Sequence, residues 1–183
     1  LSRCWDAESV LVIGAGPVGI GAVAGLKAFG VPNVYVTELS AYRRERVAEL
    51  GGIPIDPTTE NVEERIRAQH PYGVDIVVEA VGTLPTIWQS MDLVTRGGIV
   101  NIVGEYWGKV ELERPKGTWM INDMTLIRSF YFTIPEFHEN QRMVLDGKLN
   151  AKGLATHTFP LEEIKAAYDL FDTGNSLKIL VEP

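Results

Sequence analysis

Short apolar runs alternate with amphipathic segments along most of this chain. Runs that are apolar at nearly every position are typical of parallel strands buried on both faces, and they occupy residues 10–13, 34–37, 53–55, 75–78, 99–103 and 125–132. Helical spacing predicts helices over residues 17–29, from a cap at Ser40 to 50, from a cap at Thr58 or Thr59 to about 69, over 85–95, and from 135 to about 147. The alternation predicts an α/β fold, a doubly wound, six-stranded parallel sheet with helices on both faces.

The last part of the chain has a pattern of its own. Residues 154–183, "LATHTFPLEEIKAAYDLFDTGNSLKILVEP", predict a strand, a helix and a strand, with Pro160 and Gly174 at the ends of the helix. We therefore expect a domain over residues 1–150 and a separate C-terminal segment over residues 151–183. Because Leu1 is not a methionine and a strand begins within ten residues of it, we expect an excised domain or a processed product.

Three glycines follow the first predicted strand. Gly14, Gly16 and Gly19 form the pattern G-x-G-x-x-G between a strand and a helix. In a dinucleotide site the first glycine makes a tight turn, the second lets a pyrophosphate approach the main chain, and the third lets the helix lie close to the strand. The free N–H groups of the helix N-terminus, where Pro17 fits the first position, then face the pyrophosphate. This context predicts a Rossmann fold that binds a dinucleotide.

An acidic residue ends the second predicted strand. Glu38 lies 38 − 19 = 19 residues beyond the last glycine of the motif, close to the spacing of about 20 expected for a ribose-binding acid. A carboxylate there accepts hydrogen bonds from ribose hydroxyls and repels a 2′-phosphate, which favours NAD over NADP. Two alternatives remain, a glycine turn that only packs a helix with a solvated Glu38, and a site for S-adenosylmethionine.

Composition excludes several classes of partner. A net charge of −7 argues against nucleic acid and anionic membranes. Residues 9–26 are uncharged, but five glycines and Pro17 make them a poor membrane span, so strand, turn and helix explain them better. A single cysteine excludes an internal disulfide and fits a reducing compartment, and we expect a cytoplasmic protein.

Catalytic and metal-binding motifs are not found in the sequence. His70, His138 and His157 are scattered along the chain, and none lies near Cys4 at metal-ligand spacing. We therefore assign no catalytic residue and no metal ligand to this chain.

Five motifs together resemble one enzyme family. In order and spacing, the chain from about residue 9 to residue 181 is similar to the medium-chain, zinc-type alcohol and polyol dehydrogenases, closest to the sorbitol, threonine and butanediol dehydrogenase branch. The motifs are "VLVIGAGPVGIGAVAGLKAFG", "VTELSAYRRERVAELGG", "DIVVEAVG", "RGGIVNIVG" and "HTFPLEEIKAAYDLFDTGNSLKILV". The resemblance implies an NAD-linked interconversion of a secondary alcohol and a ketone.

The resemblance also implies roles for individual residues. Gly14, Gly16 and Gly19 match the phosphate loop, and Glu38 matches the ribose-binding acid. The remaining implied cofactor contacts are Val18 beside the nicotinamide, Arg43 beside the adenosine ribose, Leu39 and Val81 around the adenine, Val103 with the backbone near Ser129 and Tyr131 at the carboxamide, Lys178 at the pyrophosphate, and also Pro17, Ala80 and Gly82.

Members of the family are roughly twice as long as this chain. Their N-terminal half supplies the zinc ligands and the proton relay, so zinc is expected only in a full-length protein, and a free-standing NAD-binding module without turnover is the alternative. In the family, subunits often pair through the edge of this sheet, which makes residues 125–132, or the segment before them, a candidate homo-oligomer interface. The tail normally packs on the missing half, so we expect its apolar side chains to fold onto their own domain, to exchange with a neighbouring copy, or to be mobile.

Overall fold

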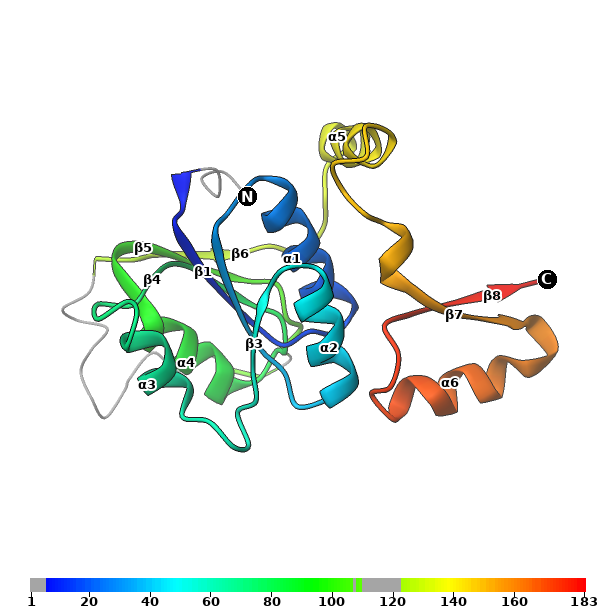
Figure 1. Ribbon diagram of the computed structural model, residues 1–183, viewed down its shortest axis with the longest axis horizontal. Helices are drawn as coiled ribbons and strands as arrows, with labels where there is room; N and C mark the ends of the chain where they lie inside the picture. The colour runs from blue at the N-terminus through cyan, green and yellow to red at the C-terminus, as the bar shows by residue number, and fades with distance from the viewer. Residues whose placement is uncertain (1–5, 107, 110–122) are drawn as a thin grey trace.

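Six parallel strands form the central sheet of the computed structural model, which describes residues 6–106, 108–109 and 123–183 (Figure 1). The strands are β1 (Ser9–Ile13), β2 (Asn33–Thr37), β3 (Ile53–Ile55), β4 (Val74–Glu79), β5 (Val94–Ile102) and β6 (Thr125–Arg128). Their order is β3-β2-β1-β4-β5-β6, and every neighbouring pair is parallel. This is the strand order of a Rossmann fold, in which ligands bind where the order reverses, between β1 and β4. The predicted six-stranded sheet is confirmed.

Helices cover both faces of the sheet, as predicted. On one face α1 (Pro17–Ala28) and α2 (Ala41–Glu49) pack on alternate strand residues such as Val10 and Val34, and on the other α3 (Val62–Arg67) and α4 (Leu84–Leu93) pack on Leu11 and Val77. Adjacent residues of one strand thus enter two different cores, which explains why the strands are apolar at consecutive positions.

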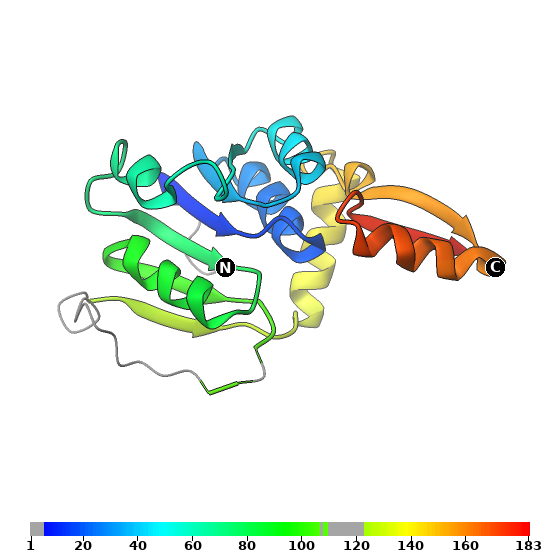
Figure 2. The ribbon, with the colours of Figure 1, turned by 90° about the horizontal axis from the view of Figure 1, so that it is seen from below.

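The C-terminal segment forms the predicted strand, helix and strand. After α5 (Ile134–Leu145) and the short helix η3 (Lys152–Leu154), the parallel strands β7 (Ala155–Pro160) and β8 (Lys178–Glu182) are joined through η4 (Leu161–Glu163) and α6 (Ile164–Asp172). This unit projects from the side of the central sheet (Figures 1 and 2). The boundary between residues 150 and 151 stays a prediction.

The apolar face of this tail is not covered by its own domain. Leu177 joins the core around α1, but Tyr168 is 66% exposed and Leu161 is 51% exposed. The expectation that the tail packs its apolar side chains on its own domain is therefore wrong, because α6 lies beside the sheet domain and not on it. Exchange with a second copy stays a prediction.

Four predicted boundaries are wrong, among them the start of β5, which was predicted at residue 99. Asn61 caps α3, while the hydroxyl of Thr58 donates to Asp56 instead. The helix predicted to reach residue 95 ends at Leu93, and β5 begins at Val94 with an irregular register around its two glycines. The strand predicted over residues 125–132 ends at Arg128.

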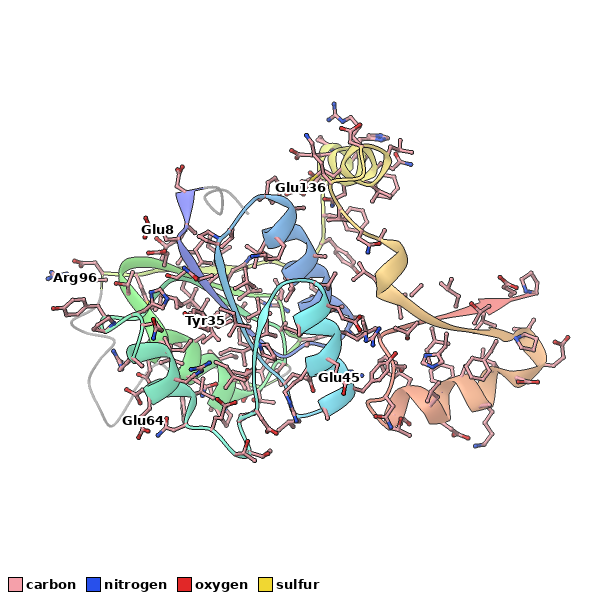
Figure 3. The ribbon with its side chains drawn as sticks, viewed as in Figure 1. Glu8, Tyr35, Glu45, Glu64, Arg96 and Glu136 are labelled. Carbon is pink, nitrogen blue, oxygen red and sulfur yellow. The ribbon has the colours of Figure 1, made fainter. Side chains whose placement is uncertain are left out.

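Polar side chains lie on the outside of the sheet domain. Glu8, Glu45, Glu64 and Arg96 point away from it, whereas Tyr35 lies within its body (Figure 3). Among the helices of the described residues, none is long and apolar enough to cross a membrane.

Candidate functional site

A cleft of about 380 Å³ opens at the carboxyl ends of β1, β2 and β4. It is lined by Ile13, Gly14, Gly16, Thr37, Glu38, Leu39, Arg43, Pro57, Ala80, Val81, Thr86 and Gln89. Seven of these are predicted site residues: Gly14, Gly16, Glu38, Leu39, Arg43, Ala80 and Val81. The cleft therefore lies at the point where the strand order reverses, where open α/β sheets bind their ligands.

The glycine turn forms the floor of this cleft. Gly14 has a φ of +90°, a conformation that favours glycine, and its N–H donates to the carbonyl of Thr37 at 2.8 Å. A Cβ on Gly19 would overlap the carbonyl oxygen of Gly14, whereas one on Gly16 would meet nothing within 4 Å. The turn is thus tightly packed against α1 at Gly19 and leaves its backbone open at Gly16, which fits a diphosphate lying against the main chain.

The N-terminus of α1 completes the anion-binding side of the cleft. The helix has 12 residues with Pro17 in its first turn, no side chain caps it, and no acidic residue occupies its first turn. The N–H groups of its first turn are therefore not used by a side-chain cap.

Glu38 is held at the rim of the cleft by two backbone donors. The N–H of Ala15 donates to Oε2, and the N–H of Ser40 donates to Oε1, each at 2.8 Å. An ionised carboxylate has about four acceptor positions, so each oxygen keeps capacity for one more donor. The half-buried Glu38 side chain can therefore accept two hydroxyl groups without moving.

Arg44 lies behind Glu38 and is occupied by the protein. It donates to the carbonyls of Glu38 and Leu39 at 2.9 and 2.6 Å and pairs with Asp56 at 2.8 Å. The pKa of Asp56 is lowered, because the hydroxyl and then the N–H of Thr58 donate to its carboxylate, with Arg44 adding a smaller effect. Asp56 thus stays ionised beside Arg44.

Arg43 connects the cleft to the C-terminal tail. Its Nε donates to the carbonyl of Ser176 at 3.0 Å, and its guanidinium lies 5.9 Å from the centre of the Phe171 ring. Ser40, whose backbone holds Glu38, also donates its hydroxyl to the carbonyl of Gly174 at 2.8 Å. The rim of the cleft and the segment before β8 are therefore joined by hydrogen bonds.

Two exposed apolar side chains stand at the mouth of the cleft. Leu39 follows β2 and is 69% exposed, and Val81 follows β4 and is 46% exposed. Exposed apolar groups on two sides of a cleft suit a flat aromatic ligand.

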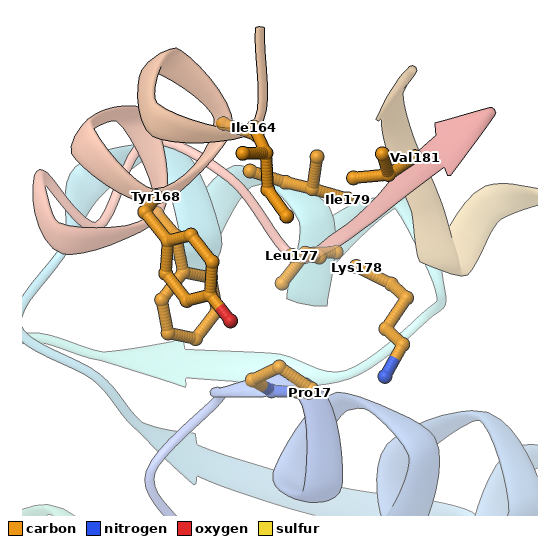
Figure 4. A pocket seen from close by; sticks show the side chains of 9 residues that line it. Pro17, Ile164, Tyr168, Leu177, Lys178, Ile179 and Val181 are labelled. Carbon is orange, nitrogen blue, oxygen red and sulfur yellow. The ribbon is translucent and has the colours of Figure 1, made fainter. Parts of the chain in front are cut away.

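Two predicted residues lie in a second cavity of about 270 Å³, between α1 and the tail. Pro17 and Lys178 line it together with apolar residues of α6 and β8, and the ammonium group of Lys178 points toward Pro17 (Figure 4). Lys178 is thereby directed at the N-terminus of α1.

The remaining predicted residues surround the cleft without lining it. Val18 is 58% exposed in the first turn of α1, and Gly82 has a φ of +81° in the turn after β4. Val103 donates its N–H to Glu79, Ser129 donates its N–H to Ile102, and Tyr131 is 82% exposed. Val18 follows β1, and the other four lie beyond the ends of β4, β5 and β6, at the same edge of the sheet as the cleft.

Sequence reasoning missed five lining residues and one buried acid. Ile13 is one of the five, and it was predicted only as the end of the first strand. Thr37, Pro57, Thr86 and Gln89 carry no spacing signal that marks them as cleft residues. Glu79 is fully buried beneath the cleft, and an acid in the apolar run "DIVVEAVG" was a signal that could have marked it.

The histidines do not form a site. His70 lies 3.2 Å from the hydroxyl of the buried Tyr35, His138 is exposed on α5, and His157 lies in β7. In the part of the chain that the structure describes, no group of three or more His, Cys, Asp or Glu residues could hold a metal ion. These residues therefore do not fit a catalytic zinc.

Two curated relatives align with nearly the whole chain. L-galactonate-5-dehydrogenase of Escherichia coli K12 is 32% identical over 166 residues, which cover 88% of this chain and 47% of that protein. L-threonine 3-dehydrogenase of Symbiobacterium thermophilum is 30% identical over 182 residues, which cover 97% of this chain and 51% of that protein. The chain thus spans about half the length of the curated relatives it matches.

Solved structures agree with the fold. The alcohol dehydrogenase TADH from Thermus sp. ATN1 superposes with a TM-score of 0.88 at 32% identity, over 96% of this chain and 51% of that one. A Sinorhizobium meliloti protein described as a putative zinc-binding dehydrogenase, solved bound to NADP, gives 0.84 at 26% identity, over 96% and 52%. A family model described as zinc-binding dehydrogenase matches residues 17–146, well over half of the chain. The chain belongs to the zinc-binding dehydrogenase family, as its five motifs predicted.

Proposed function

We propose that this chain is the NAD-binding part of a zinc-dependent alcohol or polyol dehydrogenase that interconverts a secondary alcohol and a ketone by hydride transfer. The observation that carries the proposal is the fixed carboxylate of Glu38 beside the Gly14–Gly16–Gly19 turn, in a member of this family. Bound nicotinamide supplies the hydride acceptor or donor. The chain supplies the pocket that holds the cofactor in place.

Each part of the pocket has a proposed task. The open backbone at Gly16 and the N-terminus of α1 bind the pyrophosphate, and Lys178 adds a positive charge near it. Leu39 and Val81 enclose the adenine from opposite sides of the cleft. The other proposed contacts are Arg43 at the adenosine ribose, Val18 at the nicotinamide, the backbone of Val103, Ser129 and Tyr131 at its carboxamide, and Pro17, Gly19, Ala80 and Gly82 in the surrounding turns.

Glu38 gives the proposal its sharpest test, which is cofactor choice. Its oxygens can accept two ribose hydroxyls but would face a 2′-phosphate as a like charge, although one related structure is bound to NADP. We expect calorimetry to give NADP⁺ a Kd about tenfold or more above that of NAD⁺, a difference of about 1.4 kcal/mol. Glu38→Gln should narrow this gap by removing the charge.

Glu45→Gln is the matched control, because it removes the same charge from the exposed face of α2 near the cleft. In this variant the difference in Kd between NADP⁺ and NAD⁺ should stay as in the wild-type chain. Equal affinity for both cofactors in the wild-type chain contradicts the role of Glu38. Binding of S-adenosylmethionine in place of NAD⁺ contradicts the proposed function itself.

The zinc chemistry belongs to the longer protein that we propose. The described residues hold no group of three or more side chains that could bind a metal ion, so we propose that residues outside this chain polarise the alcohol oxygen. We propose a reducing, cytoplasmic location from the single cysteine. We also propose homo-oligomer formation through β6, which with β3 is one of the two edge strands of the sheet among the described residues.

A further inference from the structure

Glu79 is a fully buried acid that none of the cofactor roles above uses. It is the last residue of β4, and its side chain is 0% exposed. Burying a carboxylate costs free energy unless donors compensate it, so its contacts indicate what keeps it there.

One oxygen of Glu79 holds the turn that follows β4. Oε1 accepts the N–H of Val81 at 3.0 Å, the N–H of Gly82 at 2.8 Å and the hydroxyl of Thr86 at 2.8 Å. Three donors on one oxygen fix the backbone between β4 and α4 from beneath. In this turn the N–H of Ala80 donates to the carbonyl of Ile13 in β1 at 2.9 Å, whereas the N–H groups of Val81 and Gly82 donate to Glu79.

The main chain of Glu79 holds the residues that follow β5. The main-chain carbonyl of Glu79 accepts the N–H groups of Val103 and Gly104 at 2.8 and 2.9 Å. Within the described residues Oε2 has no hydrogen-bond partner, and it would lie 2.6 Å from a Cβ on Gly104. In the part of the chain that the structure describes, only Oε1 therefore accepts hydrogen bonds. Oε2 lies beside Gly104, where the absence of a side chain leaves space for it.

The fixed turn carries a wall of the cleft. Val81 Cγ2 would lie 2.6 Å from a Cβ on Gly14, so the valine side chain rests directly on the glycine turn. Val81 also lines the cleft opposite Leu39. The position of this wall thus depends on two backbone N–H groups that both bind Glu79.

We propose that Glu79 is a positioning residue for the cofactor, which holds the turn of residues 80–82 so that Val81 forms one wall of the adenine site; this rests on the proposed function. Glu79 does not touch the cleft itself. It acts through Val81, and its loss displaces that wall even where the sheet remains folded.

The test compares two apolar variants that each remove a three-donor carboxylate from β4. Glu79→Leu removes it at the cleft end. Asp75→Leu removes it at the opposite end, where Oδ2 accepts Glu8 N–H, Ser9 N–H and the Ser9 hydroxyl at 3.0, 2.9 and 3.0 Å. Both variants should unfold at lower temperature. Calorimetry with NAD⁺ on the folded protein should show about a tenfold loss of affinity for Glu79→Leu and no change for Asp75→Leu.

Glu79→Gln provides the rescue, because its carbonyl oxygen can replace Oε1 for all three donors. We expect its Kd for NAD⁺ to stay within about threefold of wild type. If Glu79→Leu does not fold, Glu79→Asp replaces it, since the shorter side chain cannot reach both N–H groups and should also weaken binding.

Three results overturn the proposal. A Glu79→Leu or Glu79→Asp protein that binds NAD⁺ like wild type shows that the turn does not need the acid. Equal losses for Glu79→Leu and Asp75→Leu show a general effect on the fold. A wild-type chain that binds no NAD⁺ overturns the proposed function, and with it this role of Glu79. That outcome differs from the first two because it is seen in the unmutated chain.

Discussion

Two glycines of α1, only two positions apart, differ in what a methyl group would meet. A Cβ on Gly19 would overlap the carbonyl oxygen of Gly14, whereas one on Gly21 would have nothing within 4 Å. The same sequence signal, glycine in a helix, therefore has two physical meanings. At Gly19 it allows α1 to approach the turn after β1, and at Gly21 it only lowers helix propensity.

Alanine at these two positions should change the stability of the chain in opposite directions. Gly19→Ala should destabilise the chain by about 1–3 kcal/mol, because a backbone shift must relieve the overlap, and it should weaken NAD⁺ binding. Gly21→Ala should stabilise the chain by about 0.5–1 kcal/mol and leave NAD⁺ binding unchanged. Urea unfolding and calorimetry measure both effects. Changes of the same sign in the two variants would contradict this account of α1.

At the scale of elements, α2 is the helix that connects the cleft with the tail. The hydroxyl of Ser40 accepts the N–H of Arg43 as the helix cap at 3.3 Å and donates to the carbonyl of Gly174 at 2.8 Å. Asn61 caps α3 in the same way through the N–H of Glu64, and the structure gives it no contact with the tail. Both residues thus cap a helix through the same kind of hydrogen bond, and Ser40 in addition holds the tail.

Ser40→Ala should therefore do more than uncap a helix. We expect both Ser40→Ala and Asn61→Ala to cost about 1 kcal/mol of stability, measured by urea unfolding. Only Ser40→Ala should speed hydrogen exchange in residues 173–177, because only it releases the Gly174 carbonyl. Unchanged exchange there, or equal exchange in the two variants, would mean that Ser40 does not restrain the tail.

Elements were predictable where local chemistry decides them. Consecutive apolar positions marked the strands because each strand is buried on two faces. The helices predicted to end near residues 29 and 147 do end close to Gly30 and Gly147, whose φ values of +83° and +69° favour glycine after a helix. The start of α3 was not predictable, because Thr58 and Asn61 are both good caps and the choice rests on the contact of Thr58 with Asp56. The predicted end of β6 was wrong for a related reason. Strand-forming aromatic residues continue to residue 132, but β5 pairs with β6 only as far as Arg128.

At the scale of the whole molecule, the site was only partly predictable. The glycine turn and Glu38 follow from spacing along 31 residues, from 10 to 40. Thr86 and Gln89 lie on α4, which follows β4, and they line the cleft only because β4 pairs with β1. No local sequence pattern encodes that pairing. Glu79 is the clearest case, because its role depends on the ends of β4 and β5 and on the Gly14 turn meeting at one point.

The outer edge of the sheet is the surface on which the whole molecule is expected to pair. Among the described residues β6 pairs with β5 alone, and Leu126 in its middle is 43% exposed. A charged side chain on an edge strand opposes pairing with another copy. Leu126→Lys should therefore convert a dimer of the chain into monomers in light scattering after size-exclusion chromatography.

Tyr168→Lys is the matched comparison, because Tyr168 is a 66% exposed aromatic residue on the uncovered face of α6. If copies pair through the sheet edge, this variant stays dimeric, since the added charge lies on the tail. If instead Tyr168→Lys produces monomers and Leu126→Lys stays dimeric, the copies pair through their tails, and the apolar face of α6 is covered by the exchange of tails between neighbours. The two variants therefore distinguish a continuous sheet across two copies from an exchanged tail, because each mechanism depends on a different exposed surface of the same chain.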